Sequence, residues 1–160
     1  MLAEMIFQKE ELFDELFRIY LRNEEPVSRR AAWVIDAVTE KLPALLTDKI
    51  DIMAEALPSF NHNGLKRHTL HILSRSPLPA QKHSGFLINL CFGWLVSPVE
   101  AVATKIYCME LLYRFSEGEP DIKQELVNSI EWRLYEEPPG FRSRGVKVLK
   151  KLYKDLSFRK

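Results

Sequence analysis

Apolar residues recur along this chain with the spacing of amphipathic α-helices. Leu12, Leu16, Ile19 and Tyr20 form one such series and would share one face of a helix. No comparable stretch alternates between apolar and polar residues as a half-buried β-strand does. The pattern therefore predicts an all-α fold.

The prolines divide this pattern into eight predicted helices. All nine lie between the apolar-periodic stretches, at Pro26, Pro43, Pro58, Pro77, Pro79, Pro98, Pro120, Pro138 and Pro139. Proline breaks a helix interior but is tolerated in the first turn, so these positions indicate corners. We expect helices of roughly 14 to 18 residues, with even-numbered ones beginning near Pro26, Asn61, Pro98 and Pro139.

Two local signals predict the ends of the sixth helix. The run Ser97-Pro98-Val99-Glu100 combines a serine cap, a proline at the first helical position and a glutamate three residues after the cap. Gly118, just before Pro120, suits a helix stop because glycine readily adopts the left-handed conformation found there.

The even-numbered helices repeat one another. The stretches "SRRAAWVID", "LKRHTLHIL", "TKIYCMELL" and "FRSRGVKVL" superpose without gaps from Ser28, Leu65, Thr104 and Phe141. Their second position is always basic, and the four basic residues are separated by 37, 39 and 37 residues. A fourfold match at nearly constant spacing indicates structural repeats.

Three further columns of this alignment predict how the repeats pack. The fifth position is small or modest in size, the sixth is larger and apolar, and the eighth is aliphatic. The members in that order are Ala32, Thr69, Cys108 and Gly145; Trp33, Leu70, Met109 and Val146; and Ile35, Ile72, Leu111 and Val148. We expect the small column to allow close approach of helices and both apolar columns to fill the space between layers.

This pattern resembles HEAT repeats, whose second helix carries a basic residue, then alanines, then leucine. The resemblance implies a right-handed superhelix, or solenoid, of about four helical hairpins, although armadillo repeats share similar spacing. It also implies a single domain over residues 1–160 with approximate repeats 1–42, 43–77, 78–118 and 119–160. The even-numbered helices would line the concave face.

The chain departs from the HEAT pattern in one respect. Members of the family often place an aspartate six residues before the basic position, where it pairs with that residue. The corresponding positions here are Asn23, Phe60, Val99 and Glu136, of which only the last is acidic. Pairing with an acid at this position therefore accounts for only one of the four basic residues in this sequence.

The net charge of the chain does not favour electrostatic binding to nucleic acid or to a membrane surface. The chain holds 23 Lys and Arg against 22 Asp and Glu, which gives a net charge of +1. The distribution is uneven, because residues 1–25 hold seven acids and three bases, whereas residues 141–160 hold eight bases and one acid. One end is acidic and the other is basic.

The basic column has two possible explanations. In the first, the cations pair with acids of neighbouring turns, such as Glu24, Glu25, Glu117, Glu119 or Glu136. In the second, stacking brings the cations onto one face that binds phosphates or an acidic protein segment. The candidate binding residues are Arg29, Arg30, Lys66, Arg67, Lys105, Arg142, Arg144 and Lys147.

The last helix supports a binding surface. Lys147, Lys150, Lys151 and Lys154 recur at helical spacing along one face, while the opposite face is aliphatic. A solvated cap on the final repeat gives the same pattern.

No motif in the sequence indicates catalysis, a cofactor or a metal. His68 and His71 lie three residues apart, but no carboxylate stands at a matching interval, so we expect satisfied or exposed histidines. HEAT-like DNA glycosylases, which excise alkylated bases, hold DNA on a basic concave surface with aromatic residues and an acid. Trp33, Asp36 and Arg29 could adopt that arrangement, although core packing in the sixth column also explains Trp33.

The remaining features predict a cytoplasmic protein. Cys91 and Cys108 lie in apolar surroundings without paired spacing, which indicates buried, reduced thiols. The N-terminal residues lack the basic and apolar regions of a signal peptide. The most apolar run, 86–96, falls short of the ~20 residues that span a bilayer, so no membrane partner is expected.

These observations favour a non-catalytic interaction module that binds an acidic protein segment on its concave face. The alternative is a nucleic-acid-binding protein related to the alkylated-base glycosylases, distinguished by affinity that falls steeply with salt. We expect a monomer. Head-to-tail association of the acidic and basic ends is a weaker alternative, because such an interface builds rings or fibres.

Overall fold

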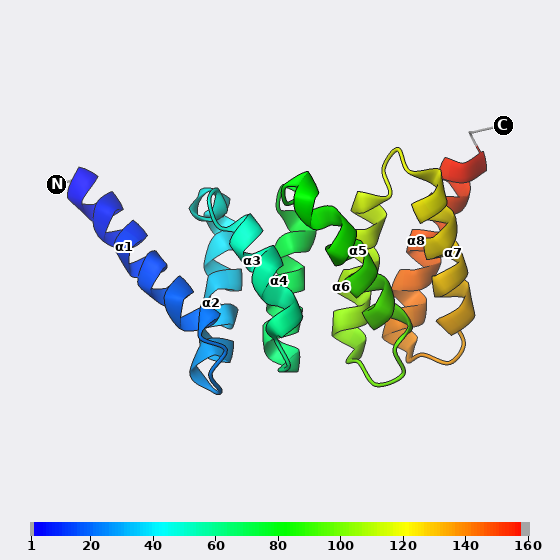
Figure 1. Ribbon diagram of the computed structural model, residues 1–160, viewed down its shortest axis with the longest axis horizontal. Helices are drawn as coiled ribbons and strands as arrows, with labels where there is room; N and C mark the ends of the chain where they lie inside the picture. The colour runs from blue at the N-terminus through cyan, green and yellow to red at the C-terminus, as the bar shows by residue number, and fades with distance from the viewer. Residues whose placement is uncertain (1, 158–160) are drawn as a thin grey trace. The chain divides into compact units, whose positions relative to one another are not determined.

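The computed structural model describes residues 2–157, with side chains from residue 9 onward, and this part of the chain is helical without a strand (Figure 1). Its α-helices are α1 (Leu2–Leu21), α2 (Val27–Lys41), α3 (Ile50–Ala56), α4 (Asn63–Arg75), α5 (Ser84–Val96), α6 (Val102–Phe115), α7 (Pro120–Arg133) and α8 (Pro139–Ser157). Three short 3-10 helices are η1 (Pro43–Leu46), η2 (Leu57–Ser59) and η3 (Gln81–His83). The predicted all-α fold of successive helical pairs is confirmed.

The chain forms two compact units, Met1–Pro79 and Ala80–Lys160. In the first unit, α2 packs against α1 and α4, and α3 packs against α4. In the second unit, α8 packs against α6 and α7, and α5 packs against α6 and α7. Each unit thus stacks two helical hairpins with its even-numbered helices in contact. The right-handed superhelix over the whole chain stays a prediction.

The core of the first unit is built around an aromatic cluster. Tyr20 lies against Phe17 and Phe60, with ring centroids 5.4 and 5.3 Å away. Its hydroxyl shares a 2.5 Å hydrogen bond with the hydroxyl of Thr69, a member of the small column. This bond satisfies a buried polar group and fixes α1 against α4.

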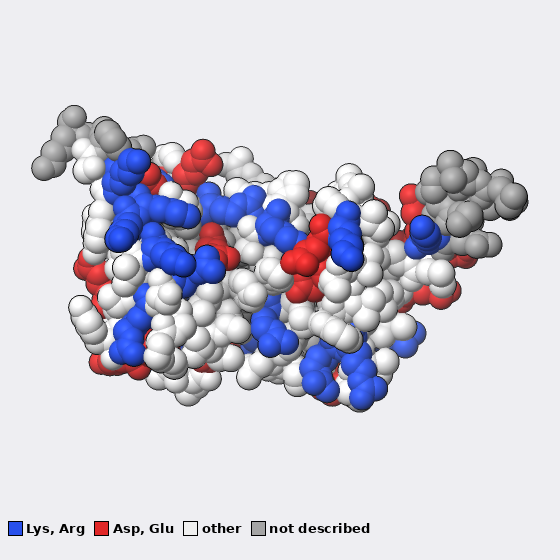
Figure 2. Space-filling view, turned by 180° about the vertical axis from the view of Figure 1, so that it is seen from behind, with Lys and Arg blue, Asp and Glu red and all other residues white. Residues whose placement is uncertain are grey.

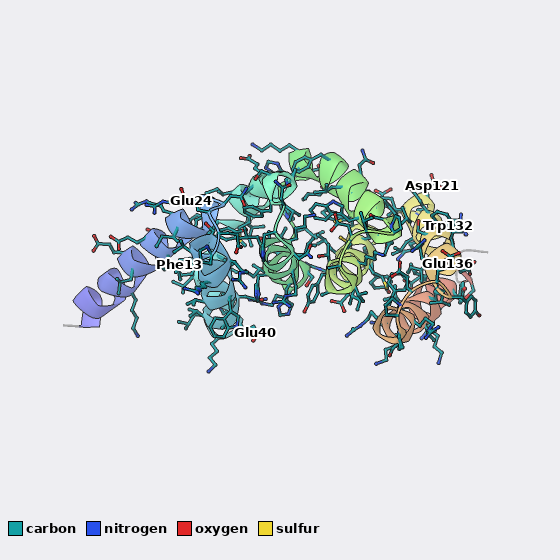
Figure 3. All side chains as sticks on the ribbon, turned by 90° about the horizontal axis from the view of Figure 1, so that it is seen from below. Phe13, Glu24, Glu40, Asp121, Trp132 and Glu136 are labelled. Atoms are coloured by element: carbon teal, nitrogen blue, oxygen red, sulfur yellow. The ribbon has the colours of Figure 1, made fainter. Side chains whose placement is uncertain are left out.

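The core of the second unit depends on close helix approach at Gly145. A Cβ at this position would lie 3.0 Å from Leu134 Cδ1 and 3.1 Å from Ile130 Cγ2. All four members of the small column and all four members of the eighth-position column are buried. In Figure 3, side chains of α6, α7 and α8 meet in the space between these helices. The packing role of both columns is confirmed.

Only two of the four residues in the sixth column are buried, so the prediction of a core position is wrong for the other two. Leu70 and Met109 are fully buried, whereas Trp33 is 63% exposed and Val146 is 43% exposed. The reason is that α2 and α8 each bury a single narrow stripe of residues, while the buried faces of α4 and α6 are wider. Trp33 is therefore a surface residue and not a member of the core.

The predicted start of the sixth helix is also wrong. α6 begins at Val102, because Ser97 Oγ accepts a 3.2 Å hydrogen bond from the Val99 amide and closes a local turn instead of capping the helix. The predicted stop at Gly118 is confirmed, since this residue has φ +73° just beyond the end of α6. The starts of α2, α4 and α8 agree with their predicted positions.

Helix lengths vary more than predicted. The third helix is a seven-residue α3 flanked by η1 and η2, and α1 extends over 20 residues. Pro43 and Pro58 lie in the first turns of the two 3-10 helices, where the missing N–H costs little. Each range predicted for a repeat encloses one helical pair.

Candidate functional site

The structure divides the four-residue basic column by burial. Arg29 is exposed at the start of α2 and Arg142 is half-buried on α8, whereas Lys66 and Lys105 are buried. Arg29 Nε lies 3.3 Å from Glu25 Oε2, which is one of the ion pairs expected from the sequence. The column is therefore not a uniform surface stripe.

Lys105 forms a buried ion pair within the second unit. Its Nζ donates to Glu137 Oε1 at 2.6 Å, and the same oxygen accepts from Arg133 Nε and Nη2 at 3.1 and 2.8 Å. Burial alone would raise the pKa of the Glu137 carboxyl, but the hydrogen bonds from Lys105 and Arg133 outweigh it and lower the pKa. The partner is Glu137 and not the neighbouring Glu136, so Lys105 serves the internal packing of α6, α7 and α8.

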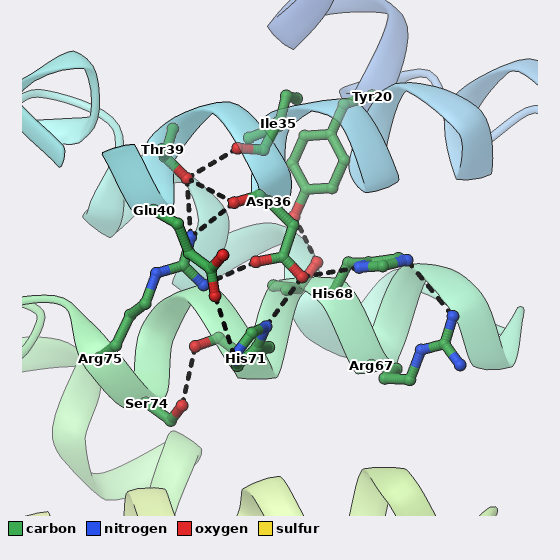
Figure 4. A network of polar contacts seen from close by, with 11 residues as sticks. Tyr20, Ile35, Asp36, Thr39, Glu40, Arg67, His68, His71, Ser74 and Arg75 are labelled. Carbon is green, nitrogen blue, oxygen red and sulfur yellow. Dashed lines mark hydrogen bonds and ion pairs between the residues drawn. The ribbon is translucent and has the colours of Figure 1, made fainter. Parts of the chain in front are cut away.

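A second buried network in the first unit centres on Asp36 of α2. Figure 4 shows side chains of α4 converging on its carboxylate. His68 Nδ1 and His71 Nδ1 lie 2.7 and 2.9 Å from Asp36 Oδ2, and Arg75 Nη1 donates to Oδ1 at 2.6 Å. Arg75 Nη2 also donates to the Asp36 carbonyl oxygen and to Thr39 Oγ1, which clamps α2 to α4.

This network fixes the charge and the ring orientations of its members. Burial alone would raise the pKa of Asp36, but hydrogen bonds from His68, His71 and Arg75 outweigh it and lower the pKa to about 2. An ionised carboxylate only accepts hydrogen bonds, so both histidines donate from Nδ1. Of the two predicted states for His68 and His71, satisfied or exposed, the structure shows satisfied histidines. Within residues 2–157, no group of three or more His, Cys, Asp or Glu is arranged to hold a metal.

The structure does not bring Trp33, Asp36 and Arg29 together as a base-excising set. Trp33 lies at the surface, whereas the Asp36 side chain is only 9% exposed and accepts from three donors. A carboxylate enclosed in this way holds two helices together and does not face an incoming nucleotide. The glycosylase arrangement considered from the sequence has no acid in the required position.

A surface hollow of about 400 Å³ lies in the first unit beside this network. We call it the arginine hollow, and its lining residues are Arg29, Arg30, Trp33, Arg67 and His68. Three of the five, all arginines, are among the binding residues predicted from the sequence. Trp33 was predicted to pack in the core and His68 was not among the predicted binding residues, although the spacing of Arg29, Arg30 and Trp33 along one turn of α2 is a usable signal.

A second basic surface lies on α8 in the other unit. We call it the α8 basic face, and it consists of Arg142, Lys147, Lys150, Lys151 and Lys154. Figure 2 shows Lys and Arg side chains crowded over α8 at the left of the view. No member forms an ion pair with a described carboxylate, whereas Nη1 of the adjacent Arg144 lies 2.7 Å from Glu110 Oε1 in an ion pair.

A comparison with protein families decides the class of the molecule. A family model described as a HEAT repeat domain matches residues 1–152. The chain belongs to the HEAT repeat family. No curated protein and no solved structure matches it.

HEAT repeats usually mediate protein interactions, and membership of the family indicates a protein-interaction or scaffold module. None of the helices described for this HEAT repeat protein is both long and apolar enough to cross a bilayer. The arginine hollow and the α8 basic face are therefore the candidate binding surfaces of this HEAT repeat protein.

Proposed function

We propose that this HEAT repeat protein is a non-catalytic interaction module that binds an acidic segment of a partner protein through exposed cations of its even-numbered helices. The observation that carries the proposal is the α8 basic face, whose five cations lack ion-pair partners among the described carboxylates. Lys147, Lys150 and Lys154 are exposed, whereas Arg142 is half-buried and Lys151 Nζ lies 5.7 Å from the ring centroid of Tyr113. Exposed cations outside ion pairs remain available to an external carboxylate at little desolvation cost.

The residues predicted for binding contribute unequally to this proposal. Arg142 and Lys147 belong to the α8 basic face, and Arg29, Arg30 and Arg67 line the arginine hollow. Lys105 is left out because its ammonium is enclosed with Glu137. Lys66 is also left out because it is buried, and Arg144 stands at the margin beside Glu110.

A charge-reversal experiment tests the proposal. Lys147→Glu combined with Lys150→Glu should weaken binding of a fluorescent glutamate-rich peptide by about tenfold or more, because two attractive contacts become repulsive. Fluorescence anisotropy at low salt measures the affinity, and thermal unfolding verifies that the exposed substitutions leave the fold intact.

The matched control is Lys41→Glu combined with Lys82→Glu, which changes the net charge equally at two exposed positions outside both basic surfaces. Its affinity for the peptide should stay close to that of the wild type. Equal weakening by both double variants would reduce the effect to net charge and contradict a defined binding face. Failure of the wild type to bind the peptide at low salt would reject the proposal outright.

A nucleic acid is the competing ligand, because the exposed indole of Trp33 beside three arginines could contact bases and phosphates. The enclosed Asp36 argues against the glycosylase version of this function. Duplex DNA bound more tightly than the acidic peptide, with affinity falling steeply between about 0.05 and 0.2 M salt, would favour it.

We further propose a reducing compartment such as the cytoplasm. Both cysteines are buried and neither forms a disulfide, which suits a protein that does not depend on oxidation for stability. No cofactor enters the proposed function.

A further inference from the structure

The arginine hollow concentrates positive charge in a unit that is otherwise acidic. Residues 1–79 contain ten Lys and Arg against twelve Asp and Glu, yet three arginines and no carboxylate line the hollow. A net negative unit does not attract a polyanion along its length. The local arrangement instead suits one compact, strongly charged anionic group.

The arginines that line the hollow have N–H donors that take part in no ion pair with a described carboxylate. Arg29 uses Nε toward Glu25, which leaves its two terminal amino groups outside that ion pair. Arg67 Nη2 approaches His68 Nε2 at 3.4 Å, and neither Arg67 nor Arg30 has an ion-pair partner among the described residues. Guanidinium groups held near one another repel, and an anion with several acceptor oxygens relieves that repulsion.

Two features hold the hollow in shape. The stem of Arg29 lies so close to the backbone of Gly64 that a Cβ there would fall 2.9 Å from Arg29 Cγ and Cδ. His68 is oriented from behind by its Nδ1 hydrogen bond to the buried Asp36, which leaves Nε2 on the side of Arg67. Arg29 and His68, held by packing and by a hydrogen bond, therefore lose little freedom when a ligand binds.

We propose that the arginine hollow binds the phosphoryl group of a phosphorylated serine or threonine within the acidic partner segment. This inference rests on the proposed function and names the chemistry of one contact. A phosphomonoester carries nearly two negative charges and three acceptor oxygens, which matches a hollow lined by three arginines better than a carboxylate does. The exposed indole of Trp33 at the same hollow offers an apolar surface to a side chain next to the phosphorylated residue.

The experiment compares three synthetic acidic peptides that differ at one position, which is serine, phosphoserine or aspartate. The wild type should bind the phosphoserine peptide about tenfold more tightly than the serine peptide, with aspartate close to serine, because only the phosphoryl group offers enough acceptors. Equal affinity for all three peptides would overturn the inference while leaving the proposed function intact.

Variants then separate the two basic surfaces. Arg30→Ala combined with Arg67→Ala should weaken phosphoserine-peptide binding about tenfold more than serine-peptide binding and so abolish the preference for phosphoserine. Lys147→Glu combined with Lys150→Glu should weaken both peptides and preserve their ratio. Loss of the phosphoserine preference in the α8 variant, with retention in the arginine variant, would place the phosphate elsewhere and reject the arginine hollow.

A third variant tests geometry at constant charge. Gly64→Ala should displace the stem of Arg29 and reduce the phosphoserine preference by roughly threefold, although it adds no charge and favours the helix. Gly93→Ala is its control, because a Cβ at Gly93 meets nothing within 4 Å. An unchanged preference in Gly64→Ala would remove Arg29 from the site.

Competition distinguishes the possible sources of the phosphate. Inorganic phosphate should displace the phosphoserine peptide at lower concentration than sulfate, as expected if the added negative charge is recognised. The inference would be overturned in favour of a nucleic acid by two results together. Single-stranded DNA would bind more tightly than the phosphoserine peptide, and Arg30→Ala combined with Arg67→Ala would abolish this DNA binding.

Discussion

At the scale of single residues, the Asp36 network makes the free energy of unfolding depend on pH. The folded-state pKa of about 2 lies below the ordinary value of 3.8, so the carboxylate contributes stability that is present above pH 4 and lost as pH falls toward 2. The shift corresponds to about 2 kcal/mol of unfolding free energy. Urea unfolding of the wild type at several pH values should show this loss between about pH 4 and 2.

The same residue can be tested by substitution. Asp36→Asn should lower the unfolding free energy at neutral pH by about 3 kcal/mol, because Arg75 loses its buried carboxylate and the amide cannot accept from every former donor. Asp121→Asn is the control, since Asp121 is exposed on α7. An unfolding free energy in Asp36→Asn that matches the control would show that the network contributes no net stability.

The sequence predicts whether the histidines bind a metal, but it does not predict which residues they form hydrogen bonds with. The sequence predicts that His68 and His71 are satisfied or exposed, because no metal-binding interval accompanies them. The hydrogen bonds that Asp36 accepts from His68, His71 and Arg75 cross 32, 35 and 39 positions along the chain. Such pairs depend on how α2 sits against α4, which local periodicity does not encode.

At the scale of helices, repeat columns predicted close contacts better than they predicted exposure. Gly145 lies at a real close approach, whereas Trp33 occupies a matching column position but faces solvent. A column records spacing along each helix, but the buried faces differ in width between helices and are set by how each helix packs in three dimensions. The arginine hollow was only partly predictable for this reason.

Gly145 provides the test at this scale. Gly145→Leu should destabilise the protein by about 1 to 3 kcal/mol or more, because the new side chain would overlap Leu134 and Ile130. Gly93→Leu, also within a helix of the second unit but in open surroundings, should stabilise slightly through helix propensity. Thermal unfolding measures both, and equal melting temperatures would contradict a tight contact between α7 and α8.

At the scale of the whole molecule, the charge distribution poses the question of self-association. Residues 1–25 are acidic and residues 141–160 are basic, so two copies attract one another at these segments. The attraction acts mainly between exposed charges, which are worth little and are screened within about 10 Å at 0.1 M salt. Pairing of unlike segments also produces a heterologous contact that does not close in a dimer.

We therefore expect a monomer at both low and high ionic strength. Sedimentation velocity at about 0.05 M and 0.5 M salt should give one species whose coefficient does not rise with protein concentration. The matched variant is Lys150→Glu with Lys154→Glu, which weakens the basic segment and should leave the sedimentation pattern of a monomer unchanged. A coefficient that rises with concentration only at low salt, and falls back in this variant, would show that the oppositely charged segments do join copies of the chain. Acidic partners would then compete with self-association for the same lysines, and the peptide affinities predicted for the α8 basic face would depend on protein concentration.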